Sequence, residues 1–202
     1  MSDDRADTAV YLYVNRLMTD QPPYDATISM LIANLVALAL VPVAGLLFLL
    51  PYVLIWDNIL DRLSRLFEGK VWWTAILIFV LSIVVHELLH AVGYVWVGGV
   101  PRTAVKFGFS WRGLAPYAHC HEPMTARAYR TAVMLPGLIL GLLPAVLGLI
   151  IGSFGLTIFG AIMVMAAGGD LAVLLAIRDV PPTAIVRDHP TKVGCEVVSW
   201  PA

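Results

Sequence analysis

The stretch AILIFVLSIVVHELLH, residues 75–90, decides how this chain folds. It begins as an apolar run typical of a membrane helix and ends in a segment that contains His86, Glu87 and His90. On a helix, residues four apart lie on the same face, so the two imidazoles can bind one metal ion. Ionisable side chains inside a membrane span are costly to bury and are usually functional. The stretch therefore predicts a metal site within a membrane helix.

The composition of the whole chain also indicates a membrane protein. Of its 202 residues, 59% are hydrophobic and 13% are charged, whereas soluble domains have roughly 45–50% and 25%. A soluble domain of this size could not bury so many apolar side chains, because small domains bury too little of their surface. The formal net charge of -1 argues against a nucleic-acid partner. Two cysteines, Cys120 and Cys195, are too few for a disulfide framework.

Four apolar stretches reach the ~20 residues that a helix needs to cross a bilayer. They cover about residues 28–54, 71–100, 131–151 and 156–177. Glycine and alanine in the last two permit close helix packing. We therefore predict an all-α membrane protein whose domain, residues 28–179, is a bundle of four transmembrane helices.

The segments between and beside these stretches are more polar. Residues 55–70 have the pattern of an amphipathic helix in the membrane interface. Residues 101–125 alternate in the way that predicts a β-hairpin. Residues 1–27 form an N-terminal segment and residues 180–202 a C-terminal tail. Basic residues gather on the side that holds both termini and the hairpin, so the positive-inside rule predicts that these three parts face the cytoplasm.

Asp170 is the acidic residue within the fourth stretch and the predicted third metal ligand. His86 comes about 15 residues into the second stretch and Asp170 about 14 into the fourth, which places both ~21–23 Å deep at 1.5 Å per residue. Because these two spans run in the same direction, their side chains can meet at one depth. Gly168 and Gly169 would let the backbone approach the metal closely.

These residue types predict zinc and hydrolytic chemistry. A catalytic zinc site has three protein ligands, here His86, His90 and Asp170, and keeps an open position for water. Zinc lowers the pKa of such a water towards 7, and Glu87 would accept its proton as the general base. His119 and His121 lie on one face of the predicted hairpin, where they could bind the metal, cover the site or simply form a polar edge.

The motif His86-Glu87-Leu88-Leu89-His90-Ala91, the hairpin after it, Pro136-Gly137 and Gly169-Asp170-Leu171 resemble the putative zincin peptidases. The tail stretch DHPTKVG, residues 188–194, matches as well, and the resemblance covers roughly residues 71–198. That family of membrane proteins is similar to the site-2 protease group of intramembrane metalloproteases. The resemblance implies intramembrane cleavage of membrane-protein substrates, with zinc on two histidines and one aspartate. Residues 136–141 contain no Asn of the kind that site-2 proteases carry there, and Leu171 replaces the usual Gly after the aspartate, so oxyanion stabilisation stays unassigned.

Two other classes of function remain open at this point. A non-catalytic membrane protein could use the zinc structurally or as a sensor, and would need His119 or His121 as a fourth ligand because structural sites are closed. A transporter with an ion site at the membrane midplane would need an inverted repeat or a second broken helix, and the sequence indicates neither. Glu87 favours the zinc-dependent endopeptidase, whose partners would be the lipid bilayer and a membrane-protein or peptide substrate.

Overall fold

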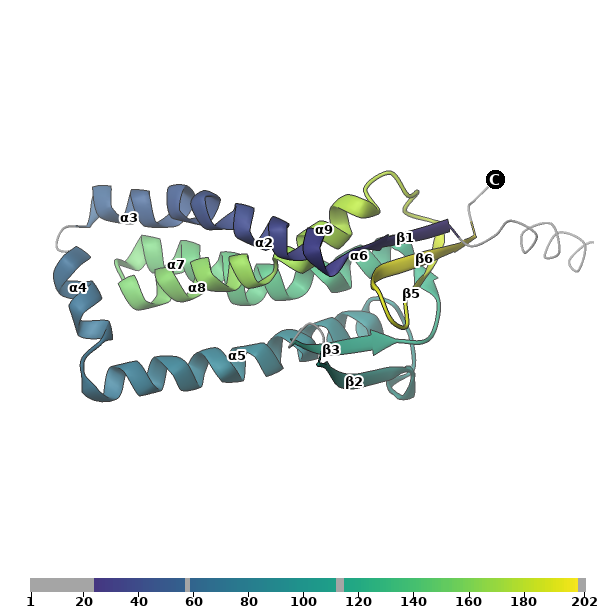
Figure 1. Cartoon of the computed structure of the whole chain (residues 1–202), viewed down its shortest axis with the longest axis horizontal. Helices are drawn as coiled ribbons and strands as arrows, with labels where there is room; N and C mark the ends of the chain where they lie inside the picture. The colour runs from purple at the N-terminus through teal and green to yellow at the C-terminus, as the bar shows by residue number, and fades with distance from the viewer. Residues whose placement is uncertain (1–23, 57–58, 112–114, 200–202) are drawn as a thin grey trace, which may run out of the picture.

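The computed structural model describes residues 24–56, 59–111 and 115–199. Its long helices lie side by side, and the strands gather at one end of them (Figure 1). The short helix α4 (Ile59–Leu66) lies at the opposite end, between α3 and α5. The site therefore has to be sought in a helical bundle that carries a small β-structure at one end.

Three helical segments are long and apolar enough to cross a membrane. They are Met30–Ile55, Gly69–Trp96 and Ala126–Ile151. The first comprises α2 (Met30–Ala44), the π-helix η1 (Gly45–Leu49) and α3 (Leu50–Ile55). The second is the single helix α5 (Gly69–Trp96). The third comprises α6 (Ala126–Pro136), the π-helix η3 (Gly137–Leu142) and α7 (Leu143–Ile151).

The fourth span is a bent pair of helices. It comprises α8 (Phe154–Ala166) and α9 (Gly168–Ala176), which meet at 43°. Counting the pair as one span gives the four predicted helices, so three to four candidate spans are present in the described part of the chain. The break falls at Ala167, whose φ of -78° and ψ of 12° leave the helical region.

Small residues let the helices approach closely. A Cβ added to Gly160 of α8 would lie 2.2 Å from the backbone nitrogen of Ala145 in α7, and one on Gly148 would lie 2.4 Å from the nitrogen of Thr157. Neither glycine can carry a side chain without separating α7 from α8. The glycines of the last two spans thus permit the close packing that the sequence predicts.

The prediction of a fold that is all-α apart from one hairpin is wrong in one respect, because the structure contains a second sheet. A four-stranded antiparallel sheet, in the order β1-β6-β5-β4, joins segments from both ends of the chain. Its strands are β1 (Tyr24–Ile28), β6 (Val193–Ser199), β5 (Ile185–Asp188) and β4 (Met124–Thr125). The expectation failed because β1 is held in the sheet by β6, more than 160 residues away along the chain, and local patterns cannot reveal such a pairing.

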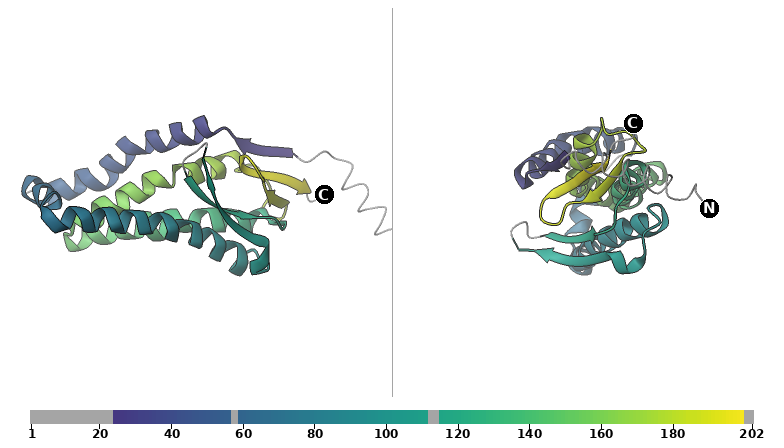
Figure 2. Two further views of the ribbon diagram at one scale, coloured as in Figure 1. Left: turned by 60° about the horizontal axis from the view of Figure 1, so that its bottom comes forward. Right: turned by 90° about the vertical axis from the view of Figure 1, so that its right-hand side faces the viewer.

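The predicted hairpin is present. It consists of β2 (Val105–Ser110) and β3 (Ala115–Cys120), which pair in antiparallel register from Val105 with Cys120 to Ser110 with Ala115. Figure 2 shows the hairpin at the same end of the bundle as the four-stranded sheet. Its predicted location in the cytoplasm, like that of both termini, stays a prediction.

Candidate metal centre

Three side chains converge between α5 and α9. His86 and His90 lie one turn apart on α5, and Asp170 lies in the first turn of α9, just after the break in the fourth span. The Nε2 atom of His86 is 3.1 Å from Oδ2 of Asp170, and Nε2 of His90 is 3.3 Å from Oδ1. Each residue offers one ligand atom, and these atoms all lie within 4.8 Å of one another. The sequence-predicted ligand set is thus brought together in a cluster that can hold a metal ion.

The spacing of these atoms fits zinc. Nitrogen and carboxylate ligands lie about 2.0–2.2 Å from zinc, so neighbouring ligand atoms in a tetrahedral site are roughly 3.3 Å apart. Each histidine nitrogen lies at about this separation from one oxygen of Asp170, His86 from Oδ2 at 3.1 Å and His90 from Oδ1 at 3.3 Å. Oδ2 of Asp170 is buried and has no hydrogen-bond partner although His86 is close. A bound cation would satisfy this oxygen, which is costly to bury unpaired.

A backbone carbonyl orients one of the histidines. Nδ1 of His90 lies 3.1 Å from the carbonyl oxygen of Ala132 in α6, so Nδ1–H donates there and Nε2 keeps its lone pair for a metal. This contact depends on Gly93, one turn further along α5, because a Cβ there would lie 2.4 Å from Cα of Ala132. The glycine lets α5 and α6 touch backbone to backbone, which brings the carbonyl within reach of His90.

The sequence of this region decides the family. A family model described as putative zincin peptidase matches residues 79–185. The match covers more than half of the 202 residues, from α5 through the hairpin and α9 to the start of β5. The chain belongs to the putative zincin peptidase family. No curated protein and no solved structure matches the chain.

Membership of this family supports a metallopeptidase and implies zinc. The family model covers HExxH on α5 and Asp170 on α9, and the structure joins them in one cluster. Nothing in the match links the chain specifically to site-2 proteases. A metal-binding zincin-like peptidase is therefore the level of function that the match and the cluster support together.

Glu87 lies next to the cluster and is half-buried. The backbone amide of Ala118, in β3, lies close enough to interact with its carboxylate. Strand β3 packs against α5 along this stretch. The hairpin therefore covers the site on the side of Glu87 and fixes that carboxylate beside the proposed ligands.

His119 and His121 are not part of the metal cluster. Nδ1 of His119 lies 2.7 Å from Oδ2 of Asp188, at the end of β5. The ring of His121 packs edge-on against that of His119, with centroids 4.4 Å apart, and burial together with the neighbouring His119 lowers the pKa of His121. Of the roles that the sequence left open, direct metal binding does not fit His119, because Asp188 engages its Nδ1.

Asp188 is the residue that the reasoning from individual residues missed. Besides His119, its carboxylate accepts hydrogen bonds from the amide of Cys120, at 3.3 Å, and the hydroxyl of Tyr129, at 3.0 Å. One partly buried carboxylate thus ties the tail sheet to the hairpin and to α6. The only signal in the sequence was the resemblance of the tail stretch that begins with this residue.

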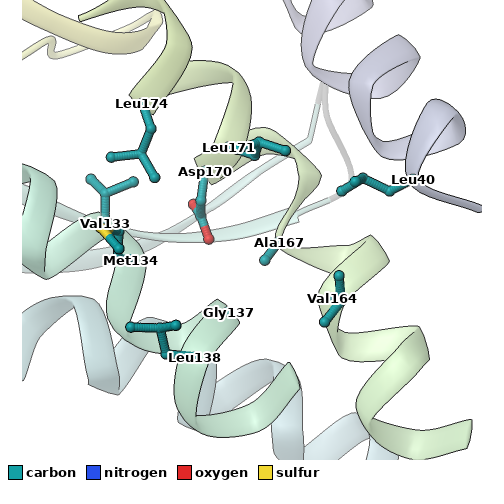
Figure 3. Close-up of a pocket in the computed structure, with 10 residues that line it drawn as sticks. All are labelled: Leu40, Val133, Met134, Gly137, Leu138, Val164, Ala167, Asp170, Leu171 and Leu174. Atoms are coloured by element: carbon teal, nitrogen blue, oxygen red, sulfur yellow. The ribbon is translucent and has the colours of Figure 1, made fainter. Parts of the chain in front are cut away.

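A cavity of about 200 Å³ reaches Asp170 from another side. Figure 3 shows the Asp170 carboxylate pointing into it, among residues of α6, η3, α8 and α9. All its other lining residues are apolar: Leu40, Val133, Met134, Gly137, Leu138, Val164, Ala167, Leu171 and Leu174. The proposed metal site thus adjoins an apolar space between candidate membrane helices.

Proposed function

We propose that this protein is a zinc-dependent intramembrane endopeptidase that cleaves membrane-protein substrates. The observation that carries the proposal is the convergence of His86, His90 and Asp170, with Glu87 beside them, on helices apolar enough to span a bilayer. Two histidines and a carboxylate leave an open coordination position, which is the arrangement of catalytic rather than structural zinc.

The protein's own residues would divide the chemistry as follows. When bound, zinc acts as a Lewis acid that activates water and polarises the scissile carbonyl. The Glu87 carboxylate takes a proton from the attacking water and delivers it to the amide nitrogen as the C–N bond breaks. The Ala132 carbonyl holds the His90 ring so that Nε2 faces Asp170 and would be free to hold zinc. Asp170 contributes a negative charge at the N-terminus of α9, where the helix dipole stabilises it.

The surroundings of the site support an apolar peptide segment as the substrate. The cavity beside Asp170 exceeds the ~150 Å³ that suffices for a benzene-sized group, so it can take one large apolar side chain. Strand β3 runs beside Glu87, so a substrate held at this carboxylate would lie against the hairpin. We expect the protein to be a multi-pass membrane protein with both termini in the cytoplasm, since the basic residues favour that orientation.

The alternative is a non-catalytic zinc protein with a structural or sensing role. A structural site would be closed by a fourth ligand. Among the described residues the cluster contains three such groups, and His119 is engaged by Asp188 instead. A structural site would also have no use for Glu87. Both observations favour the peptidase.

The decisive experiment replaces Glu87 by Gln. The amide keeps the size of the side chain but cannot accept the proton, and general acid–base catalysis contributes typically 10²–10⁴-fold. We expect Glu87→Gln to keep one zinc per chain and to lose cleavage, measured by comparing membrane proteomes of cells that carry each variant. Glu122→Gln, the same change at an exposed position, should behave as wild type.

Two results would argue against the peptidase. The first is a Glu87→Gln variant whose proteome matches that of the wild type while cells without the protein differ from both. The second is Asp170→Ala protein that retains full zinc, since Asp170 would then not be a ligand.

A further inference from the structure

Three aromatic rings connect a proposed metal ligand to the start of α6. The rings of His90 and Tyr94 lie nearly parallel, with centroids 6.4 Å apart and planes at 20°. Those of Tyr94 and Tyr129 repeat the arrangement at 6.2 Å and 21°. The two tyrosines are only 3% and 2% exposed, and side chains packed this closely move only with their neighbours. The position of the Tyr129 ring therefore limits where Tyr94 lies, and through Tyr94 it limits His90.

The Tyr129 ring is itself held by the C-terminal tail. Its hydroxyl donates at 3.0 Å to Oδ1 of Asp188, the last residue of β5. The other oxygen of this carboxylate, Oδ2, lies 2.7 Å from Nδ1 of His119 and accepts from the amide of Cys120 at 3.3 Å. With contacts on both oxygens, the carboxylate has one fixed orientation, and the Tyr129 hydroxyl has a fixed acceptor.

The tail also holds the first turn of α6. The first N–H groups of a helix have no partner within the helix. Here the amide of Ala126 donates to the carbonyl of Ala184 at 2.8 Å, and that of Arg127 donates to the carbonyl of Pro182 at 3.0 Å. The segment that leads into β5 thus determines where α6 begins.

Two parts of α6 act on His90. The Ala132 carbonyl, three residues after Tyr129, lies 3.1 Å from Nδ1 of His90 and orients the ring directly. Tyr129 supports the same ring from the side, through Tyr94. A shift of the first turns of α6 would therefore disturb His90 through both contacts.

The chemistry of Asp188 suits this geometric role. A carboxylate that is 13% exposed loses much of its hydration, which is costly. An ionised carboxylate is acceptor-only and has about four lone-pair sites, so donors from two different elements can meet on it. An amide in its place would have one acceptor oxygen and would turn two N–H donors towards the same groups.

We propose that Asp188 is a positioning residue of the metal site, which fixes the start of α6 through Tyr129 and thereby orients His90. The C-terminal sheet is then a part of the metal-binding unit. The inference rests on the zinc-binding part of the proposed function but not on catalysis.

Two buried tyrosines allow a matched test. Tyr129→Phe removes a hydroxyl that donates to Asp188 at 3.0 Å, and Tyr52→Phe removes one that donates to the Gly152 carbonyl at 2.8 Å. Tyr52 lies in α3, at the end of the bundle opposite the four-stranded sheet (Figure 1). Asp188→Asn tests the carboxylate itself, because it keeps the shape of the side chain but replaces one acceptor by a donor.

Three measurements on detergent-purified protein separate orientation from stability. Competition with a chromophoric chelator gives the zinc affinity, and the visible spectrum of the cobalt-substituted protein reports the geometry of the ligands. Thermal unfolding of the metal-free protein gives the Tm, so that affinities are compared at a temperature at which every variant is folded.

We expect Tyr129→Phe and Asp188→Asn to weaken zinc binding by about 10-fold, the lower end of the range for partners that orient a metal-bound histidine. Their cobalt spectra should differ from that of the wild type, whereas Tyr52→Phe should keep the wild-type affinity and spectrum.

The proposal is overturned if Tyr129→Phe matches Tyr52→Phe in zinc affinity and cobalt spectrum, since the tail contact would then serve stability alone. Wild-type affinity and spectrum in Asp188→Asn would overturn it as well. If Asp188→Asn does not fold, Tyr129→Phe decides the question. Wild-type protein that binds no zinc would instead refute the proposed function.

Discussion

Gly93→Ala should weaken zinc binding although Gly93 touches no metal ligand atom. The added Cβ would lie 2.4 Å from Cα and 2.6 Å from Cβ of Ala132. Carbon atoms pack at about 3.5–4.0 Å, so α5 and α6 must separate locally by about 1 Å. The contact between His90 Nδ1 and the Ala132 carbonyl, now 3.1 Å, would lengthen to roughly 4 Å, beyond hydrogen-bond range.

Without this contact the His90 ring can rotate, and its proton is no longer held on Nδ1. Removing such an orienting partner typically costs 10–100-fold in metal affinity, which corresponds to about 1.4–2.7 kcal/mol. Overpacking at the same place should lower the free energy of unfolding by about 1–3 kcal/mol. Titration of detergent-purified protein against a chromophoric zinc chelator measures the first effect, and thermal unfolding of the metal-free protein measures the second.

A matched glycine elsewhere in the bundle provides the control. Gly155 also lies in a helix, but a Cβ there meets nothing within 4 Å. Gly155→Ala should therefore bind zinc like the wild type and be equally or slightly more stable, because alanine favours the helix. If Gly93→Ala binds zinc as tightly as the Gly155→Ala control, the backbone contact between α5 and α6 does not orient His90 and the reasoning fails.

Three further predictions concern residues around the site. Burial raises the pKa of the Cys195 thiol from its ordinary 9.0 to about 12, so alkylation at pH 8 should be negligible in folded protein. The contribution of this thiol to stability should decline as the pH rises from 9 towards 12. Rapid alkylation at pH 8 would contradict the burial. Asp188→Ala leaves three donors without an acceptor and should destabilise the protein by about 3 kcal/mol or more. Thermal unfolding would detect this loss, and an unchanged Tm would contradict it. Tyr52→Phe removes a buried hydroxyl that donates to the Gly152 carbonyl at 2.8 Å and accepts from Arg62 at 2.6 Å. It should lower the free energy of unfolding by about 1 kcal/mol, which the same unfolding assay measures. An unchanged stability would show that the contact of Arg62 with the Gly152 carbonyl is sufficient at this end of the bundle.

The candidate membrane spans and the metal-binding cluster were predictable because each depends on a regular count along a helix. His86 and His90 share a face of α5 through the 3.6-residue period. Asp170 could be matched to them because parallel spans convert residue number into depth at 1.5 Å per residue. The separations of 3.1 and 3.3 Å agree with that estimate.

The four-stranded sheet and the hydrogen bonds to Asp188 could not be predicted in this way. β1 and β6 are short, and their pairing joins residues such as Tyr24 and Val197 that no local period relates. Asp188 receives hydrogen bonds from His119, Cys120 and Tyr129, which lie 59 to 69 residues away along the chain. Such contacts depend on how separate elements dock, and the docking of the tail leaves no periodic pattern in the sequence.

The break in the fourth candidate span is the feature that brings Asp170 to His86 and His90. A straight helix through Ala167 would keep all its backbone N–H groups bonded and would offer no N-terminus at the depth of His86. The 43° bend starts a new helix there and places Asp170 in its first turn. The bend also requires Gly168, since a Cβ on it would lie 2.4 Å from Cα of Ala37 in α2. Irregular backbone at membrane depth is tolerated where protein surrounds it, and here α2 and α6 pack against α9 while its first turn supplies the third proposed ligand.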